Sequence, residues 1–234
     1  MSDLVLRVSS VRRATPASRI VRLALDEARF DYAAGQVASI GPVDTPDRVP
    51  YSIASAPEET ARDGHLEFLI KIDASGRWGE NFQPLRRGGR VGLRGPSGSF
   101  VFPKSPREGR FLFIAGGTGI APLRSMIRHA ALTGVKGTFR LLYSARTPND
   151  FAYLAELRAM ARDGEVELAL SSTREVPPRW RGDRGRIAPA QLARLLDHPE
   201  TLCFVCGPAA MVADVPPMLE ALGVERSRIR LEDW

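Results

Sequence analysis

The chain has 234 residues, a net charge of +6 and a hydrophobic fraction of 44%, which fit a folded globular protein of two ordinary domains and exclude intrinsic disorder. Thirty of its 33 basic residues are arginine, but no Lys/Arg run resembles a nucleic-acid-binding arm, so a phosphorylated ligand or acidic protein suits the charge better. No apolar stretch is long enough to cross a membrane, and the first residues do not resemble a signal peptide. A cytoplasmic location without membrane attachment is therefore expected.

The first half of the chain reads as short strands separated by turn residues. Several runs alternate apolar and polar residues, and Gly, Pro and Asp interrupt them. The expected strands cover residues 4–13, 19–25, 36–40, 50–55, 65–72 and 90–95. Six strands at this spacing predict an antiparallel β-barrel. One short helix over about 78–86 is expected between the last two strands.

The second half alternates strands and helices. Strands are expected at 111–115, 139–145, 166–172, 201–207 and the chain end, with helices at 122–132, 150–161, 189–196 and 209–222. This rhythm predicts an α/β domain with a doubly wound parallel sheet and helices on both faces. The segment 103–109 is the expected linker, so the predicted domains are 1–105 and 106–234.

The segment FLFIAGGTGIAPLR, residues 111–124, predicts a phosphate site. A buried strand runs into three glycines, and a helix starts near Pro122. Free N–H groups and the helix dipole favour an anion at such a start, and glycines let the main chain approach a pyrophosphate. The spacing departs from the usual dinucleotide fingerprint, and an ordinary strand–helix turn is the alternative.

The only cysteines, Cys203 and Cys206, have C-x-x-C spacing. No second cysteine pair or nearby histidine completes four metal ligands, so neither a metal site nor an iron–sulfur cluster is expected. A thioredoxin-like redox pair is the alternative, although the surrounding sequence reads as a strand end.

Five motifs together resemble the ferredoxin–NADP reductase family of flavin-dependent oxidoreductases. They are RVPYSIAS (48–55), GRWGENF (76–82), GPSGSF (95–100), GGTGIAPLRSM (116–126) and CGPAAM (206–211) with the chain end LEDW. The resemblance implies an FAD-binding antiparallel barrel domain followed by an NAD(P)-binding α/β domain. GPSGSF is equally compatible with a purely structural corner.

The resemblance implies that Tyr51 contacts the flavin ring or ribityl chain and that Ser52 hydrogen-bonds near N5. The family pattern is R-x-Y-S, but Arg48 lies three residues before Tyr51 and Val49 takes the arginine's usual place. A bulge at Pro50 would return the guanidinium to the pyrophosphate; another arginine or a solvated Arg48 are the alternatives.

The family's second flavin motif, G-x-x-S/T-x-x-L, starts a helix that receives the pyrophosphate. Gly76 matches it, whereas Gly79 replaces the hydroxyl residue and Phe82 the leucine. These departures raise the alternative that FAD is held loosely. The expected flavin-binding residues are Arg48, Tyr51, Ser52, Ile53, Gly76, Trp78 and Gly79.

The resemblance also implies a nicotinamide-nucleotide site in the second domain. Its expected residues are Gly116, Gly117, Thr118, Gly119, Pro122, Ser144, Arg146, Cys206, Gly207, Pro208 and Met211. Ser144 and Arg146 end one strand, and Ser171, Ser172 and Arg174 follow the next, with no acidic residue at the strand ends. This composition favours NADP over NAD, unless Arg146 is simply a solvated loop residue.

By the same resemblance, Ser52, Cys206 and Glu232 are the expected catalytic residues. Ser52 and Glu232 would handle the proton at flavin N5, and Cys206 would shape the nicotinamide pocket. Trp234 would stack on the flavin, with a core plug as the alternative.

The implied activity is hydride transfer from NAD(P)H to bound FAD, followed by electron release to a separate ferredoxin, flavodoxin or oxygenase. The alternatives are an NAD(P)H:flavin reductase with diffusible flavin and a non-catalytic nucleotide-binding subunit. The arginine-rich segment 86–94 would dock an acidic carrier, or would form the solvated face of a hairpin.

Overall fold

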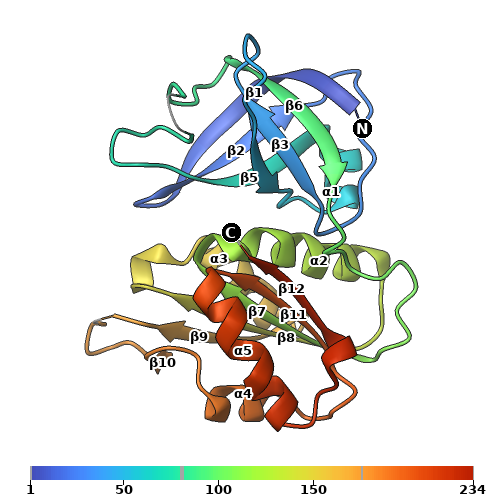
Figure 1. Cartoon of the computed structure of the whole chain (residues 1–234), viewed down its shortest axis with the longest axis vertical. Coiled ribbons are helices and arrows are strands. Elements are labelled where there is room, and N and C mark those ends of the chain that lie inside the picture. The colour runs from blue at the N-terminus through green and yellow to red at the C-terminus, as the bar shows by residue number, and fades with distance from the viewer. Residues whose placement is uncertain (1, 80–81, 175, 234) are drawn as a thin grey trace. The chain divides into compact units, whose positions relative to one another are not determined.

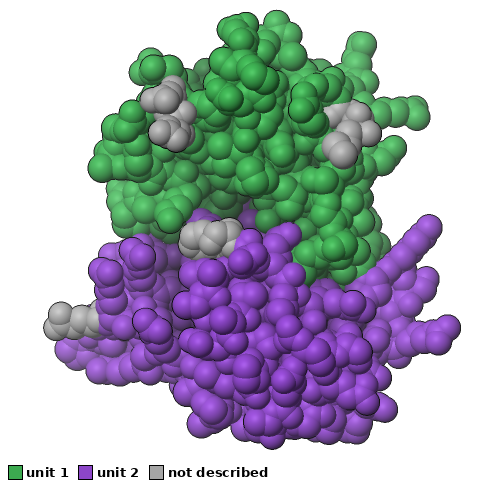
Figure 2. All heavy atoms as spheres, viewed as in Figure 1, with its two compact units in different colours: residues 1–102, 124–133 green, residues 103–123, 134–234 purple. Residues whose placement is uncertain are grey.

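The computed structural model describes residues 2–79, 82–174 and 176–233. Its contacts divide the chain into two compact units, coloured separately in Figure 2: residues 1–102 with 124–133, and residues 103–123 with 134–234. The helix α2 (Ile120–Thr133) therefore contributes its first turn to the second unit and the rest to the first.

The first unit is built on an antiparallel sheet of six strands. They are β1 (Ser2–Thr15), β2 (Ser18–Ala24), β3 (Val37–Gly41), β4 (Val49–Ser52), β5 (His65–Lys71) and β6 (Arg90–Ser97), in the order β4-β3-β6-β1-β2-β5 (Figure 1). An antiparallel bridge between Ile53 and Phe68 joins the two outer strands and closes the sheet. The predicted antiparallel barrel and its six strands are confirmed.

Alternation along the strands supplies the core of this unit. Leu6 and Val8 of β1, and Val21 and Leu23 of β2, are almost fully buried, because every second side chain points inward. The aromatic rings of Phe30, Phe68, Trp78 and Phe82 complete this core.

The helix predicted over 78–86 is wrong within the described residues, of which 78–79 and 82–86 are not helical. Asp73 instead holds a tight loop, accepting hydrogen bonds from the backbone N–H groups of Ser75 and Arg77 at 2.9 Å. Gly79 and Pro84 also disfavour a helix there.

The helix of this region is α1 (Pro57–Asp63), which the sequence analysis missed. Pro57 occupies its first turn, the Glu59 carboxylate accepts a hydrogen bond from the Ala56 N–H at 3.0 Å, and Gly64 ends it in the left-handed region. These are ordinary start and stop signals, so the helix was readable from the sequence.

The second unit is a parallel sheet with helices. Its strands are β7 (Arg110–Gly116), β8 (Thr138–Ala145), β9 (Glu167–Ser172), β10 (Asp183–Arg184), β11 (Leu202–Gly207) and β12 (Ile229–Asp233), in the order β10-β9-β8-β7-β11-β12. Besides α2, its helices are α3 (Leu154–Arg162), α4 (Pro189–Leu195) and α5 (Ala209–Ala221). The doubly wound α/β prediction is confirmed, except that the short edge strand β10 was not foreseen.

The two faces of this sheet bury different side chains. Leu112 and Cys203 share a face with residues of α4 and α5. The opposite face carries a stack of phenylalanines: the rings of Phe113 and Phe204 lie 5.3 Å apart, and those of Phe111 and Phe139 lie 5.0 Å apart. The stack packs between the strands β7, β8 and β11, the first of which leads into the glycine loop.

Candidate functional site

The strand β4 positions Tyr51 and Ser52, which pair with Ala38 and Val37 of β3. The Tyr51 hydroxyl donates a hydrogen bond to the Trp78 carbonyl, and burial raises the pKa of Tyr51 to about 12. Tyr51 is therefore a neutral phenol held in one orientation. Ile53 closes the barrel and its side chain is fully buried, which leaves only its backbone for a cofactor.

Trp78 is a core residue in the described structure. Its ring lies 6.3 Å from that of Tyr51 and 4.8 Å from that of Phe82, and its Nε1 donates to the Gln83 carbonyl at 2.8 Å. Trp78 thus packs against Tyr51 of β4 from within the core. A direct contact between Trp78 and flavin stays a prediction.

The two departures from the family's phosphate motif belong together. A Cβ on Gly79 would come within 2.5 Å of the Phe82 ring. Phe82, which is larger than the family's leucine, therefore requires glycine at position 79. The Ser/Thr hydroxyl of the family motif is absent here because the Phe82 ring fills that part of the core. Gly76 has a φ of +82° and open space around it.

The Arg48 guanidinium is used within its own turn. Its Nη1 donates to the carbonyls of Pro42 at 2.9 Å and Thr45 at 2.6 Å, and the group lies over Gly41 and Gly92, where a Cβ would collide with it. Arg48 therefore has a structural role in its own turn. The phosphate contact expected for Arg48 stays a prediction.

The glycine loop lies at the carboxyl end of β7, where the 3-10 turn Gly117–Gly119 leads into α2. A Cβ on Gly119 would stand 2.3 Å from the Cys206 carbonyl oxygen, and one on Gly116 would stand 2.8 Å from the Pro208 ring. Pro122 lies in the first turn of α2, where a missing N–H costs nothing. Gly116 and Gly119 therefore allow the loop to pack closely against the end of β11. A helix start of this kind leaves backbone N–H groups that suit a phosphate.

Tyr143 fixes the glycine loop, a role that the sequence analysis did not assign. Its fully buried hydroxyl donates to the Gly117 carbonyl at 3.0 Å and accepts from the Ala152 N–H at 3.1 Å. Tyr143 stands directly before Ser144 on a central strand of the sheet. That position was the sequence signal that could have identified its role. Met211 lies on the other side of the loop, with its methyl group against Gly207.

Cys206 and Glu232 are brought together by the parallel pairing of β11 and β12. The Cys206 Sγ donates to Glu232 Oε2 at 3.8 Å. Burial raises the pKa of the Cys206 thiol well above its usual value, and the negative charge of Glu232 raises it further. Cys206 is therefore a neutral thiol rather than a nucleophile.

Cys203 and Cys206 do not form a redox pair. They lie three positions apart on one strand, so their side chains point to opposite faces of the sheet, and both are free. Cys203 packs with Leu112 and Leu219 on the face of α4 and α5. Within the described part of the chain, no cluster of His, Cys, Asp or Glu is arranged to hold a metal ion.

The residues expected near the adenosine of the nicotinamide nucleotide differ in whether their side chains can reach a ligand. Ser171 and Ser172 are fully buried, and their hydroxyls donate to the carbonyls of Gly185 and Arg146 at 2.9 and 3.0 Å. Ser144 is also buried. By contrast, Arg146 and Arg174 are exposed neighbours, since the Arg174 N–H donates to the Arg146 carbonyl at 2.9 Å. The arginines, rather than the serines, are free to meet a phosphate.

Thr118 is half-buried in the glycine loop, and its cofactor contact stays a prediction. Trp234 lies outside the described residues. Across the described segments, no helix is both long and apolar enough to cross a bilayer.

Two family models match the chain in the order in which its units occur. Residues 5–102 match an oxidoreductase FAD-binding domain, and residues 113–216 match an oxidoreductase NAD-binding domain. The two matches support the cofactor types that the motifs imply, FAD and a nicotinamide nucleotide.

Two of the similar proteins are named as reductases. The chain is 33% identical over 195 residues to ferredoxin–NADP reductase B of Sorangium cellulosum, covering 79% of the chain and 77% of that protein. It is 30% identical over 239 residues to the reductase component of propane 2-monooxygenase from Rhodococcus jostii, covering 98% of the chain but only 63% of that protein. The chain thus spans less than two thirds of the second relative.

Solved structures share the fold. A ferredoxin–NADP reductase from Neisseria gonorrhoeae with bound FAD and NADP has a TM-score of 0.83 at 21% identity, covering 100% of the chain and 99% of that structure. An Amycolatopsis cytochrome P450 reductase has a TM-score of 0.87 at 25% identity, covering 99% of the chain and 69% of that structure.

Proposed function

The chain belongs to the ferredoxin–NADP reductase family, and on that basis we propose that it passes hydride from NAD(P)H to FAD and then electrons to a separate protein. A bound FAD supplies the hydride acceptor and a bound nicotinamide the donor. The observation that carries the proposal is the glycine loop, whose main chain meets the Cys206–Gly207 peptide without any intervening side chain.

The chain's own residues bind and orient these groups. The loop 116–119 and the start of α2 present backbone N–H groups to the nucleotide phosphates. Cys206 adds a small, neutral wall to the nicotinamide pocket, because its thiol stays protonated. Tyr51 supports the flavin, and Ser52 and Glu232 hold or move the proton at flavin N5. We also propose that the Trp234 ring stacks on the flavin.

The test is anaerobic reduction of the purified protein by NADH and NADPH in parallel, followed by flavin absorbance. We expect bleaching with at least one nucleotide. Ser52→Ala should slow it roughly 10- to 100-fold, the value of a hydrogen bond to a developing charge. Ser105→Ala, at an exposed linker position, is the matched control. No bleaching with either nucleotide would leave only a binding function.

A second candidate, an NAD(P)H:flavin reductase with diffusible flavin, is favoured by one pair of observations. The Arg48 Nη1 already donates to the carbonyls of its own turn, and Gly79 offers no hydroxyl. Both reduce the side-chain donors available to a flavin phosphate. Stoichiometric yellow FAD after gel filtration supports the first function, and colourless protein that oxidises NAD(P)H only with added flavin supports the second.

We propose ferredoxin, flavodoxin or an oxygenase component as the acceptor. Arg86, Arg87 and Arg90 are exposed at the start of β6, whereas Arg94 pairs with Asp3 at 3.0 Å. The three exposed arginines support docking of an acidic carrier, which salt would weaken. A solvated hairpin face remains the alternative, and a cytoplasmic location stays a prediction.

A further inference from the structure

The edge of the parallel sheet is only partly covered. The edge strand β10 pairs with Ser171 and Ser172 of β9, and Gly182 lies against the Leu170 carbonyl, so residues 167–169 have no neighbouring strand on that side among the described residues. The Gly185 N–H donates to the Ser172 carbonyl from the β10 side. Backbone groups alternate in direction along a strand, so those of Leu168 also face this open side. An open strand edge is a template for another strand.

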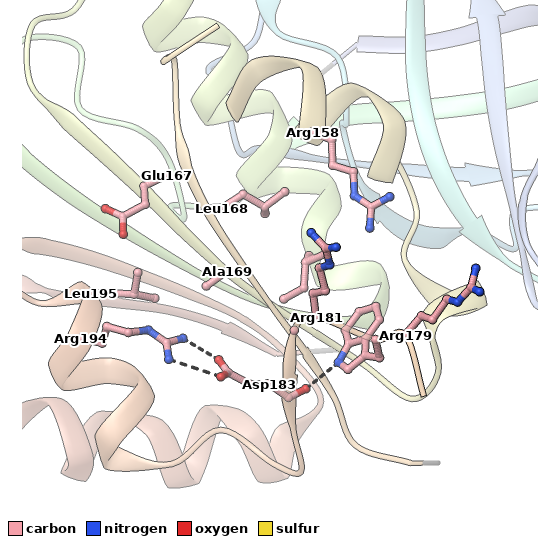
Figure 3. A pocket seen from close by; sticks show the side chains of 12 residues that line it. Arg158, Glu167, Leu168, Ala169, Arg179, Arg181, Asp183, Arg194 and Leu195 are labelled. Carbon is pink, nitrogen blue, oxygen red and sulfur yellow. Dashed lines mark hydrogen bonds and ion pairs between the residues drawn. The ribbon is translucent and has the colours of Figure 1, made fainter. Parts of the chain in front are cut away.

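A pocket of about 490 Å³ lies along this open edge. Its floor is formed by Leu168, Ala169 and Leu170 of β9, with Leu195 of α4 beside them. Figure 3 shows Arg158 of α3 and Arg194 of α4 reaching it from opposite sides of β9. The pocket therefore lies beside the edge of β9 at Leu168, whereas Gly182 lies against the Leu170 carbonyl, where a Cβ on it would come within 2.5 Å.

The acids of this pocket are already neutralised. Asp183 is held by both Nη atoms of Arg194, at 3.3 and 2.6 Å, and Glu167 pairs with Arg140 at 2.8 Å. The Arg194 guanidinium accordingly lowers the pKa of Asp183. Both carboxylates are thus already paired with arginines of this chain.

The pocket's other arginines are free. Arg158, Arg179 and Arg181 line the pocket (Figure 3) and have no ion-pair partner in the described part of the chain. Arg179 and Arg181 flank Trp180 in the sequence. Trp180 is fixed by stacking on Phe151 at 5.6 Å. The open edge is therefore rimmed by three unmatched positive charges, which suit carboxylates through paired hydrogen bonds.

We propose that the β9 edge at residues 167–169 docks an extended acidic peptide segment of a separate protein by strand addition. The peptide's main chain bonds the Leu168 backbone, and its carboxylates meet Arg158, Arg179 and Arg181. A second copy of this chain suits the site poorly, because it would bring the same arginines to the same edge.

The test uses a fluorescein-labelled peptide of about ten residues that alternates glutamate with valine, measured by fluorescence anisotropy with the full chain. The same peptide with N-methyl groups on alternate residues keeps the charge but loses main-chain donors. We expect the parent peptide to bind and the methylated one to bind at least tenfold more weakly. Equal binding of the two peptides, or no binding of the parent, overturns the proposal.

Matched variants test the arginines. Arg158→Gln with Arg181→Gln should weaken peptide binding at least tenfold. Arg12→Gln with Arg13→Gln removes the same charge from exposed positions of β1 and should change binding less than twofold. Equal losses would show that net charge alone attracts the peptide. Full displacement by tripolyphosphate at matched charge, or dimerisation through this edge in ultracentrifugation, would likewise contradict the proposal.

Discussion

Arg124 donates a hydrogen bond from Nη1 to the Glu59 carboxylate at 3.0 Å, and both side chains are about nine-tenths buried. Arg128 reaches the other oxygen of Glu59 at 2.9 Å, and Arg124 also donates to the Ala54 carbonyl at 2.7 Å. Glu59 of α1 thus anchors the part of α2 that belongs to the first unit, and Arg124 also holds Ala54, which directly follows the Tyr51–Ser52–Ile53 segment.

Glu59→Gln should destabilise the protein strongly at neutral pH. It removes the carboxylate that pairs with both Arg124 and Arg128 and leaves Glu67, at 4.0 Å, as a more distant counter-charge of the buried Arg124. Breaking a buried pair from one side costs about 3–5 kcal/mol. Urea unfolding should show this loss. Glu27→Gln, an exposed position, is the control and should stay within about 0.5 kcal/mol of the parent. A loss for Glu59→Gln as small as the control's would contradict a stabilising role for the pair.

The same carboxylate makes stability depend on pH. Burial raises the pKa of Glu59, but Arg124, the Ala56 N–H and Arg128 together outweigh it, so the pKa is lowered below 4.5. A lowered folded-state pKa gives stability that is complete above the unfolded value and is lost as pH falls through the folded value. Unfolding free energies measured between pH 7 and pH 3 should therefore fall more steeply for the parent than for Glu59→Gln.

The sequence predicted the fold well where periodicity was strong. The strand around Leu6 alternates buried and exposed side chains, whereas those around Phe113 and Phe204 are short continuous apolar runs that their length and flanking glycines identify. The helix wrongly predicted at 78–86 shows where prediction from periodicity fails. The loop before it is held by hydrogen bonds to the Asp73 side chain, and such bonds leave no periodic pattern in the sequence. The Gly79–Phe82 compensation was equally hidden, since it depends on a contact within the folded core.

Gly119→Ala tests the glycine loop. A Cβ on residue 119 would stand 2.3 Å from the Cys206 carbonyl oxygen. Because this oxygen belongs to the backbone of β11, it cannot move away as a flexible side chain could. We expect the KM for NAD(P)H to rise at least tenfold while FAD content is retained. Gly109→Ala is the control, because a Cβ at that position meets nothing within 4 Å. Unchanged kinetics in Gly119→Ala would remove the loop from the proposed site.

Replacing Arg146 and Arg174 by alanine together should change the preference between the two nucleotides. Both are exposed and adjacent at the ends of β8 and β9, so both can meet a 2′-phosphate. Loss of charged hydrogen bonds of about 1.5–3 kcal/mol predicts an NADPH KM roughly 10- to 100-fold higher, with the NADH value little changed. Arg162→Ala, on the exposed end of α3, is the control. Equal effects on both nucleotides would contradict a 2′-phosphate contact.

Cys206 should resist alkylation by iodoacetamide at pH 8 in the folded protein. Burial and the charge of Glu232 keep the thiol protonated, and only the thiolate reacts. Glu232→Gln removes the negative charge and should speed the reaction severalfold, as followed by mass spectrometry. Cys203, whose pKa burial raises to about 12, is the internal control and should stay unmodified in both proteins. Because the two thiols lie on opposite faces of β11, oxidation should give no Cys203–Cys206 disulfide, and its appearance would contradict the observed register.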